Sequence, residues 1–312
     1  MAHLLVAGKL HPAGESLLRE LPARGISVDY VQEVSEPSYA ALIGRADALV
    51  IRTQPLSAAT IARAGQLKVV SRHGVGYDAV DLAALNARGI ALAIVGDVNS
   101  VSVAEHAMMQ LLAAAKRVLR ADRAVRTPGQ WGWRNRLVIL GYGRTGRHLA
   151  RMAAGFQMQV RACDPWLERQ GWPDGPVPPV ALAEGLAWAD CISVHIPRGD
   201  RPAIGAAEIA LMRPGVILAN TARGGVVDEA ALAAALQSGH VGAAGVDVFD
   251  EEPPALGSPL FACDNALLSP HIAGLTEECG ERMAIASIRN ALDYLDGTIA
   301  PQLIVNHEAL NA

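Results

Sequence analysis

The sequence alternates short, uninterrupted apolar runs with alanine- and leucine-rich helical stretches along almost all of its 312 residues. The run Leu-Val-Ile-Leu at 137–140 has no alternation of polar and apolar residues, as expected for a strand buried on both faces. Because strands that alternate with helices are joined by crossovers, this pattern predicts parallel sheets covered by helices on both faces. The expected strands form two series, at 4–7, 26–30, 48–51, 69–71 and 91–94, and at 137–140, 159–163, 191–194, 216–220, 242–246 and 266–268.

Two such series hold more strands than one open sheet usually has. The predicted fold class is therefore α/β, with two doubly wound parallel-sheet domains. The break is expected near Ser100, where a long helical pattern at 101–126 begins and runs to the stop signal Thr127-Pro128-Gly129. A last helical pattern, about 277–296, follows the second series and is expected to return to the first domain. The predicted domains are a discontinuous one at 1–99 and 283–312, and a second at 100–282.

Composition excludes several classes of protein. Hydrophobic residues make up 51% and charged residues 19% of the chain, too apolar for a disordered protein. The net charge of −4 argues against nucleic acid or an anionic membrane as the general partner. The N-terminus lacks a signal-peptide pattern, and no apolar stretch approaches the roughly 18 residues of a membrane helix. The 4 cysteines show no CxxC pair and no metal-ligand spacing. We therefore expect a cytoplasmic protein without a bound metal.

A glycine motif follows the first strand of the second series. Gly141, Gly143 and Gly146 form GxGxxG between an apolar strand and an amphipathic helix. In this context the first glycine permits a tight turn, the second lets the backbone approach a pyrophosphate, and the third lets helix and strand pack closely. The helix N-terminus offers free N–H groups to the phosphates. The alternative is an ordinary glycine turn in a crossover unit.

The residue at the end of the next strand favours NAD as the cofactor. Asp164 lies where a carboxylate would accept hydrogen bonds from the adenosine ribose hydroxyls. A 2′-phosphate at that position would face the carboxylate, so NAD is preferred over NADP. The nearby Arg161 and Arg169 slightly weaken this preference for NAD.

Polar residues follow three later strands, in segments 220–228, 246–254 and 268–274. Reduction of a 2-keto acid needs a cation for the carboxylate and the polarised carbonyl, and a proton donor that works near pH 7. Arg223 suits the carboxylate, and His271 suits the proton transfer. Glu252 would orient the histidine ring and stabilise its protonated form. Singly, these residues are commonly a surface charge, a turn residue and a loop residue; together, behind a dinucleotide motif, they favour catalysis.

These segments resemble the D-isomer-specific 2-hydroxyacid dehydrogenase family. The most specific signatures are Asn-Thr-Ala-Arg-Gly-Gly-Val-Val-Asp-Glu at 220–229 and the stretch from Asp247-Val-Phe through Glu252-Pro to Pro270-His271. The resemblance extends to Ser-Arg-His-Gly-Val-Gly-Tyr-Asp at 71–78 and to 99–106, and so covers nearly the whole chain. It implies a flavodoxin-like substrate domain, a Rossmann NAD-binding domain, and interconversion of a small D-2-hydroxy acid and its 2-keto acid.

The resemblance also implies roles for individual residues. His271 is the expected general acid and base, Glu252 its partner, and Arg223 the group that binds the substrate carboxylate and carbonyl. The backbone N–H groups of Val75 and Gly76 would hold the same carboxylate. Helix 101–126 would form much of a homodimer interface, although its apolar run is also typical of plain core. The expected cofactor-binding residues are Gly141, Gly143, Arg144, Thr145, Gly146, Asp164, Ile196, Thr221, Ala222, Asp247 (close to the nicotinamide) and Gly274.

Within the family, the closest similarity is to short-type D-3-phosphoglycerate dehydrogenases. Arg52 and Arg72 match positions that bind the substrate's anionic end in that group, and two arginines suit a second anionic group. The alternative is that both are ordinary surface or interdomain charges. Little chain follows the last predicted helix, so we expect no room for the regulatory domain of longer relatives.

Three alternative functions are considered. Glyoxylate or hydroxypyruvate reductase stays open, because a family fixes the reaction type better than the substrate. Formate dehydrogenases of this family place Gln before Pro-His, whereas this chain has Ser269, which disfavours that activity. An NAD(H)-sensing, corepressor-like interaction protein shares the fold and these residues, and the triad alone does not exclude it. It is disfavoured because no recruiting segment is evident.

Two features depart from the family pattern. Only Arg134 and Asn135 separate Trp133 from the glycine-loop strand, where relatives have a longer link. Either the loop is trimmed or residues are omitted there, and this makes the dimer contact less certain than the cofactor fold. Arg198 follows His195-Ile-Pro197 in place of the usual Leu-Thr run. We expect its side chain to lie in solvent.

Overall fold

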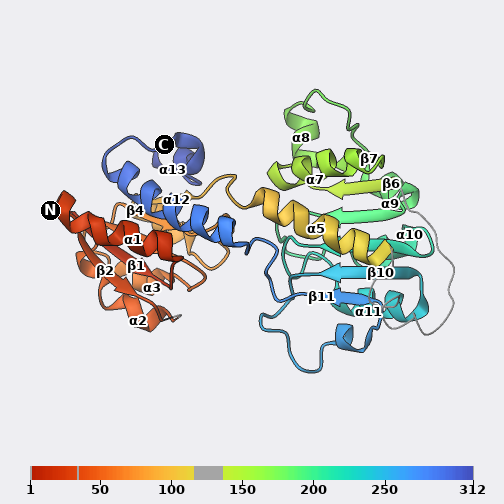
Figure 1. The fold of residues 1–312 in the computed structure, drawn as a ribbon, viewed down its shortest axis with the longest axis horizontal. Coiled ribbons are helices and arrows are strands. Elements are labelled where there is room, and N and C mark those ends of the chain that lie inside the picture. Colours follow the sequence, from red (N-terminus) through yellow and green to blue (C-terminus); the bar gives the residue numbers. More distant parts are fainter. Residues whose placement is uncertain (1, 34, 116–135, 312) are drawn as a thin grey trace. The chain divides into compact units, whose positions relative to one another are not determined.

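The computed structural model describes residues 2–33, 35–115 and 136–311. Two compact units are present, one made of Met1–Asn99 with Leu275–Ala312 and the other of Ser100–Gly274 (Figure 1). We call them unit 1 and unit 2. The sequence suggested 282/283 as the second boundary, within the last long helix. In the structure that helix packs as a whole in unit 1, so the division precedes it.

Unit 1 contains a five-stranded sheet in the order β2-β1-β3-β4-β5, in which all neighbouring strands are parallel. This is the flavodoxin-like strand order. The predicted strands are confirmed with end shifts of one residue. Their bounds are β1 (His3–Ala7), β2 (Ser27–Val31), β3 (Ala48–Ile51), β4 (Val69–Arg72) and β5 (Ala91–Ile94).

Helices cover both faces of this sheet, because successive residues of each strand point to opposite faces. Leu4 packs with α1 (Pro12–Glu20) and α12 (Glu277–Leu295), which lie side by side. Leu5 packs with the opposite layer of α2 (Glu36–Ala40), α3 (Ala58–Ala62) and α4 (Leu82–Ala87). Shorter helical elements are η1 (Leu21–Arg24), η2 (Ile43–Arg45), η4 (Pro301–Leu303) and α13 (His307–Leu310).

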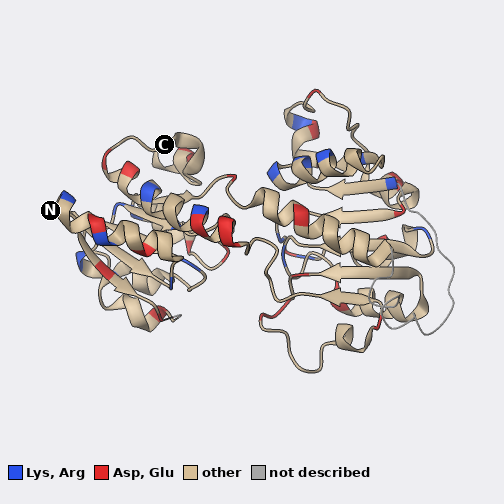
Figure 2. Ribbon diagram, viewed as in Figure 1, with Lys and Arg blue, Asp and Glu red and all other residues tan. Residues whose placement is uncertain are grey.

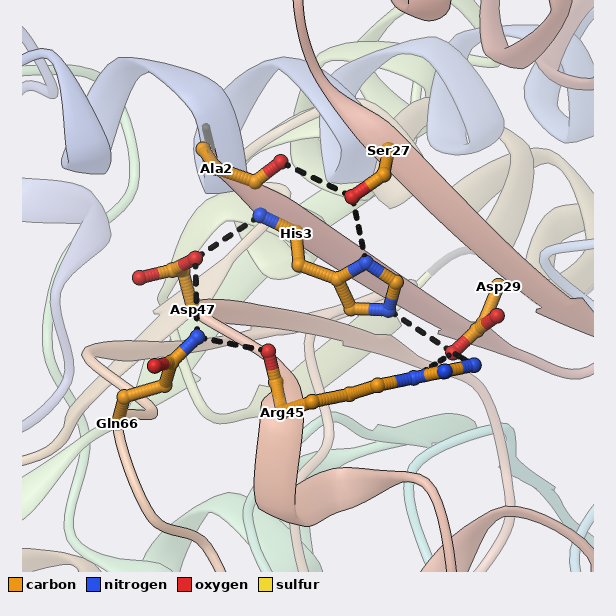
Figure 3. Close-up of polar contacts among 7 residues, drawn as sticks. All are labelled: Ala2, His3, Ser27, Asp29, Arg45, Asp47 and Gln66. Atoms are coloured by element: carbon orange, nitrogen blue, oxygen red, sulfur yellow. Dashed lines mark hydrogen bonds and ion pairs between the residues drawn. The ribbon is translucent and has the colours of Figure 1, made fainter.

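A network of polar side chains connects the amino ends of the unit 1 strands (Figure 3). The His3 ring contacts Ser27 Oγ through Nδ1 (2.7 Å) and Asp29 Oδ2 through Nε2 (2.8 Å). Burial tends to raise the pKa of Asp29, but hydrogen bonds from Arg45 and His3 outweigh it and lower the pKa. Ligands of open parallel sheets bind at the carboxyl ends of the strands. We therefore assign this serine–histidine–aspartate arrangement to stability and not to catalysis.

Unit 2 contains a six-stranded parallel sheet in the order β11-β10-β9-β8-β6-β7. An isolated parallel bridge between Ala162 and Pro179 adds a minimal further strand beyond β7, which completes a Rossmann-like edge. The segment around Pro179 therefore pairs with the edge of the sheet. The strands, all predicted to within one residue, are β6 (Arg136–Leu140), β7 (Gln159–Cys163), β8 (Cys191–Val194), β9 (Val216–Asn220), β10 (Val241–Val246) and β11 (Ala266–Leu268).

Helices again form two layers. On one face α5 (Ser100–Ala115) and α7 (Arg144–Gly155) pack on Leu137 and Ile139. The other face carries α9 (Leu182–Trp188), α10 (Ala206–Leu211) and α11 (Glu229–Ser238), which pack on Val138. The remaining elements are α8 (Pro165–Gln170) and η3 (Pro259–Ala262). The rest of the predicted helix 101–126, its stop signal and the short link at Trp133 lie outside the described residues.

Charged residues lie mainly on helices and loops, and few fall within the strands (Figure 2). Among the described residues, no helix is both long and apolar enough to cross a membrane. The same residues contain no group of three or more His, Cys, Asp or Glu side chains that could hold a metal ion. All four cysteines, at 163, 191, 263 and 279, are buried and none forms a disulfide.

Candidate active site

The three polar segments predicted from the sequence follow β9, β10 and β11, which are neighbours in the unit 2 sheet. Because these strands are parallel, their carboxyl ends lie at one edge. That edge is where open α/β sheets bind ligands. The topology therefore gathers Arg223, Glu252 and His271 at the same edge of one sheet.

His271 and Glu252 form a direct pair. Nδ1 of His271 lies 2.7 Å from Oε2 of Glu252, and the other carboxylate oxygen accepts the backbone N–H of Phe249 at 3.1 Å. The side chains are 48% and 37% exposed, so ligands can reach the ring. With Nδ1 engaged by the carboxylate, Nε2 is the nitrogen left to exchange a proton with a substrate.

The backbone of His271 is held in an unusual conformation. Its φ of 54° lies in the left-handed region that non-glycine residues seldom adopt. Its N–H donates to the carbonyl of Asp247 at 2.7 Å. The Asp247 carboxylate, fully buried, accepts the next two backbone N–H groups, those of Ile272 (3.0 Å) and Ala273 (2.9 Å). Sequence reasoning assigned Asp247 only to the cofactor and missed this contact with the histidine loop.

The loop that carries Arg223 is shaped by the asparagine before it. Asn220 Oδ1 accepts the N–H of Ala222 (3.1 Å), and its amide donates to the carbonyl of Arg223 (3.2 Å). Arg223 Nη1 donates to the carbonyl of Ala222 at 2.6 Å. A Cβ on Gly224 would overlap the Phe249 carbonyl, so the arginine loop and the Glu252 loop can approach only through a glycine.

Arg198 is exposed, as expected, but its guanidinium also lies over the loop after β9. A Cβ on Gly225 would fall 2.7 Å from Arg198 Cζ. The positive charge of Arg198 therefore lies close to the loop that carries Arg223. His195, at the start of the same segment, is unsuited to proton exchange: burial lowers its pKa to about 4, and Nε2 contacts Ser193 Oγ at 2.9 Å.

The glycine loop between β6 and α7 has the geometry that its sequence predicts. Gly141 has a φ of 93°, and a Cβ there would fall 2.6 Å from the His195 carbonyl oxygen and 2.9 Å from Ile196 Cγ2. A Cβ on Gly146 would overlap the Gly141 carbonyl, so helix and strand pack too closely for any other residue. A Cβ on Gly143 would meet nothing within 4 Å. Gly143 therefore borders open space in which a pyrophosphate can approach the backbone.

Residues around the loop also fit a dinucleotide. The α7 helix begins at Arg144 and Thr145, whose N–H groups lie in the first turn and lack intrahelical acceptors. Three arginines make this helix basic, as Figure 2 shows. Thr221 Oγ1 is buried without a hydrogen-bond partner among the described residues, so a bound ligand would satisfy it. Two other residues that the sequence assigns to the cofactor are Ala222 and Gly274. Ala222 follows Thr221 and is buried, and Gly274 is the last residue of unit 2.

Asp164 lies at the end of β7 with a fixed carboxylate. Oδ2 accepts the N–H of Tyr142 at 2.9 Å, and Oδ1 caps α8 through the N–H groups of Trp166 and Leu167. The carboxylate is thus held beside the glycine loop, as ribose binding requires. Arg161 is engaged elsewhere, with Glu184 at 2.9 Å and over the Trp188 ring, which removes one argument for a 2′-phosphate.

In unit 1, the predicted substrate residues lie at the carboxyl ends of β3 and β4. Arg52 Nη1 donates to the carbonyl of Lys9, and Arg72 Nη1 to that of His73, both at 2.6 Å. No described residue accepts from the N–H groups of Val75 and Gly76. These N–H groups are therefore available for a carboxylate.

Two further polar residues at this edge were not predicted as site residues. His73 and Gln54 are 6% and 1% exposed, and Nε2 of the one and Oε1 of the other have no hydrogen-bond partner among the described residues. Burial, and then the charges of Arg52 and Arg72, lower the pKa of His73 to about 3. A φ of 101° at Gly8 and its lack of a Cβ leave room for Gln54. The one signal for His73 is its place in the polar segment Ser71-Arg72-His73, directly after the apolar residues of β4.

Comparison with known proteins identifies the family. Residues 108–273 match the D-isomer specific 2-hydroxyacid dehydrogenase, NAD binding domain. The chain is 35% identical over 279 residues to D-3-phosphoglycerate dehydrogenase of Archaeoglobus fulgidus, covering 86% of this chain and 53% of that protein. It thus spans little more than half the length of that relative.

Other relatives match over their whole length. Glyoxylate reductase of Korarchaeum cryptofilum is 34% identical, with 94% of this chain and 95% of that protein covered. The crystal structure of the TT0316 protein from Thermus thermophilus superimposes with a TM-score of 0.85 at 31% identity, covering 97% of this chain and 99% of that one. The glycine loop of unit 2 lies within the matched NAD binding domain, and the chain belongs to the D-isomer specific 2-hydroxyacid dehydrogenase family.

Proposed function

We propose that this protein is an NAD-dependent oxidoreductase that interconverts a D-2-hydroxy acid and its 2-keto acid. The observation that carries the proposal is the His271–Glu252 pair at 2.7 Å, at the same sheet edge as Arg223 and within the range that matches the family's NAD binding domain. A carboxylate–imidazole pair beside an arginine supplies proton transfer and anion binding.

Each side chain has a defined task in the proposed reaction. Protonated His271 gives the proton on Nε2 to the keto oxygen, and Glu252 stabilises the ring while it carries the charge. Arg223 pairs with the substrate carboxylate and polarises the carbonyl, since a planar guanidinium can donate two parallel hydrogen bonds. In the oxidative direction His271 takes the proton from the hydroxyl group.

The cofactor would be held by the glycine loop and its surroundings. The backbone at Gly143, Arg144 and Thr145 would take the pyrophosphate, and Asp164 the adenosine ribose. Thr221 would satisfy its buried hydroxyl on the bound dinucleotide. When bound, NADH supplies the hydride for the keto carbon.

The substrate that we propose is 3-phosphohydroxypyruvate with its reduced partner 3-phosphoglycerate, a reaction of serine biosynthesis. Arg52 and Arg72 support it, because both guanidinium charges act on the buried His73 and a phosphate would balance them. The N–H groups of Val75 and Gly76 would bind the carboxylate end of the same substrate.

A glyoxylate or hydroxypyruvate reductase is the second candidate. The relative that carries the name glyoxylate reductase matches at almost the same identity and over nearly its whole length. In that case Arg52 and Arg72 would have structural roles through the backbone carbonyls that they already contact. An NAD(H)-sensing interaction protein would show NADH binding without turnover.

The test is the loss of NADH absorbance with 3-phosphohydroxypyruvate, hydroxypyruvate and glyoxylate in parallel. A preference for the phosphorylated acid supports the phosphoglycerate assignment. A preference for the other two supports the reductase. Binding of NADH without turnover of any of them contradicts an enzymatic role with these acids and supports the sensing function.

We also propose a cytoplasmic homodimer with α5 at its interface. Val101 and Met109 on this helix are 36% and 44% exposed, which is unusual for large apolar side chains and typical of an interface. Light scattering after gel filtration is expected to give twice the 32.7 kDa chain mass, and a monomer at micromolar concentration would contradict the proposal.

A further inference from the structure

A chain of polar side chains runs beneath the His271 loop, within unit 2. His106 and Gln110 lie one turn apart on α5, and both contact Ser269: His106 Nε2 is 3.0 Å and Gln110 Nε2 is 3.3 Å from Oγ. Ser269 Oγ is in turn 2.5 Å from Oδ1 of Asp247. His106 Nε2 is itself 3.6 Å from that oxygen. Helix α5 is thus connected to the residue that holds the His271 backbone.

Donors and acceptors give this chain a direction. A carboxylate accepts only, so the single hydroxyl proton of Ser269 goes to Asp247. The serine oxygen then has its lone pairs for the two nitrogens of α5. The amide nitrogen of Gln110 can only donate, and it lies 3.3 Å from His106 Nε2 as well as from the serine. His106 donates to the serine when Nε2 carries its ring proton. Two donors from α5 therefore strengthen the hydrogen bond that Ser269 gives to Asp247.

Asp247 connects Ser269 to the backbone of the loop that carries His271. Its carboxylate is 0% exposed and accepts the N–H groups of Ile272 and Ala273, while its carbonyl accepts that of His271. A left-handed φ at a non-glycine residue persists only where its surroundings enforce it, and these bonds hold the backbone that carries the His271 ring.

The sheet is shaped to admit the glutamine. A Cβ on Gly245 in β10 would lie 2.5 Å from Gln110 Cβ and 2.6 Å from its Oε1. Gln110 is completely buried, and Oε1 has no hydrogen-bond partner among the described residues. A leucine would fill this space without an unsatisfied oxygen, so packing alone does not explain the glutamine.

We propose that His106 and Gln110 are positioning residues for His271, acting through Ser269 and Asp247. The inference rests on the proposed function, because it assumes that His271 exchanges a proton with the substrate. Neither residue contacts the reacting atoms in this scheme; each orients the loop that carries the ring.

The first experiment compares His106→Phe with His240→Phe. His240 is a matched control in unit 2, since among the described residues its Nε2 bonds to the carbonyl of Ile209 at 2.9 Å and to no group of the His271 loop. For His106→Phe we expect kcat to fall about tenfold to a hundredfold, as for a slightly misplaced catalytic group. The KM for NADH should stay within twofold of wild type. His240→Phe should keep the wild-type kcat.

Two further variants distinguish a positioning role of His106 from a contribution to folding stability alone. His106→Gln retains a donor and should recover most of kcat. The double variant His106→Phe/Ser269→Ala should be no slower than the slower single variant, because both changes cut the same chain. Multiplicative losses would contradict a common pathway. Should His106→Phe fail to fold, Ser269→Ala tests the same claim, and an unchanged kcat in it would overturn the proposal.

A readout without turnover completes the test. The ring ¹³Cε1–¹H signal of His271, assigned with His271→Ala, should move in His106→Phe and Ser269→Ala and stay in place in His240→Phe. An unmoved signal would overturn the positioning role. If wild type binds NADH but reduces none of the keto acids, the proposed function fails, and this signal alone decides whether α5 positions the ring.

Discussion

The carboxyl edges of the two sheets use polar residues in opposite ways. In unit 2 the groups around the proposed proton donor are paired: Glu252 binds His271 at 2.7 Å, and Asp247 accepts hydrogen bonds from the loop around it. In unit 1 the edge combines two arginines with a buried neutral histidine, and buried polar atoms there have no partner among the described residues.

This difference indicates that the edge of unit 2 is preorganised for proton transfer and the edge of unit 1 for binding an anion. A proton-transfer group must be oriented before the substrate arrives, and the pairs of unit 2 accomplish this. A buried imidazole nitrogen without a partner among the described residues, beside two arginine cations, is costly until a ligand arrives, and an anion would also interact favourably with both cations, so unit 1 gains more from binding. We therefore expect variants of unit 2 to alter kcat and variants of unit 1 to alter substrate affinity.

The largest effect is expected at His271. His271→Ala removes the proton donor, and kcat should fall about a hundred- to ten-thousand-fold. Binding of NADH, measured by its fluorescence, should be unchanged because the glycine loop is intact. A kcat within tenfold of wild type would show that the proton comes from another group.

At the unit 1 edge, Arg52→Ala removes one charge–phosphate contact. Hydrogen bonds to charged groups contribute about 1.5–3 kcal/mol, so KM for 3-phosphohydroxypyruvate should rise roughly tenfold to a hundredfold. Steady-state kinetics with glyoxylate serve as the control and should show no such rise. An equal rise for both acids would assign Arg52 to the structure of unit 1.

Gly143→Ala tests the cofactor loop without disturbing its packing. The added Cβ meets nothing within 4 Å, so the thermal midpoint should stay close to wild type. It would, however, occupy the approach of the pyrophosphate, and the Kd for NADH should rise about tenfold. Gly155→Ala on the same helix is the matched control, since its Cβ also meets nothing. Equal NADH affinity in both variants would contradict the assignment.

The last prediction concerns the pH dependence of stability that arises from His73 in unit 1. Burial and the two arginines lower the pKa of His73 to about 3 when folded, against about 6.5 when unfolded. The unfolded chain therefore binds a proton first, and stability is lost as pH falls from 6.5 toward 3. At pH 5 this amounts to about 2 kcal/mol. His73→Gln should show a smaller fall of Tm between pH 7 and 5; an equal fall would contradict the neutral, buried state.

Most of the fold was predictable because its elements are local patterns. All strands of both sheets were placed to within one residue, since apolar runs bounded by turns mark buried strands. The roles of Gly141 and Gly146 were predictable because a tight turn and a close contact demand glycine. The pairing of His271 with Glu252 was predicted from the polar residues that follow the strand ends and the chemistry of a keto acid reduction, and the family resemblance implied the same roles.

Other features depend on contacts between distant residues. Ser269 was noted only as the residue before Pro-His, and its contact with His106 joins positions 163 residues apart. His73 directly follows β4, but its burial near two arginines depends on the sheet order. The unit boundary at Gly274 likewise reflects how α12 packs, which no turn signal in the sequence marks.

The most direct test of separate roles for the two edges compares Glu252→Gln in unit 2 with Arg72→Gln in unit 1. Both are assayed with 3-phosphohydroxypyruvate and glyoxylate at saturating NADH. We expect Glu252→Gln to lower kcat by the same factor for both acids. We expect Arg72→Gln to raise KM for the phosphorylated acid alone. If Arg72→Gln instead lowers kcat equally for both acids, the division between a chemical edge and an anion-binding edge is contradicted.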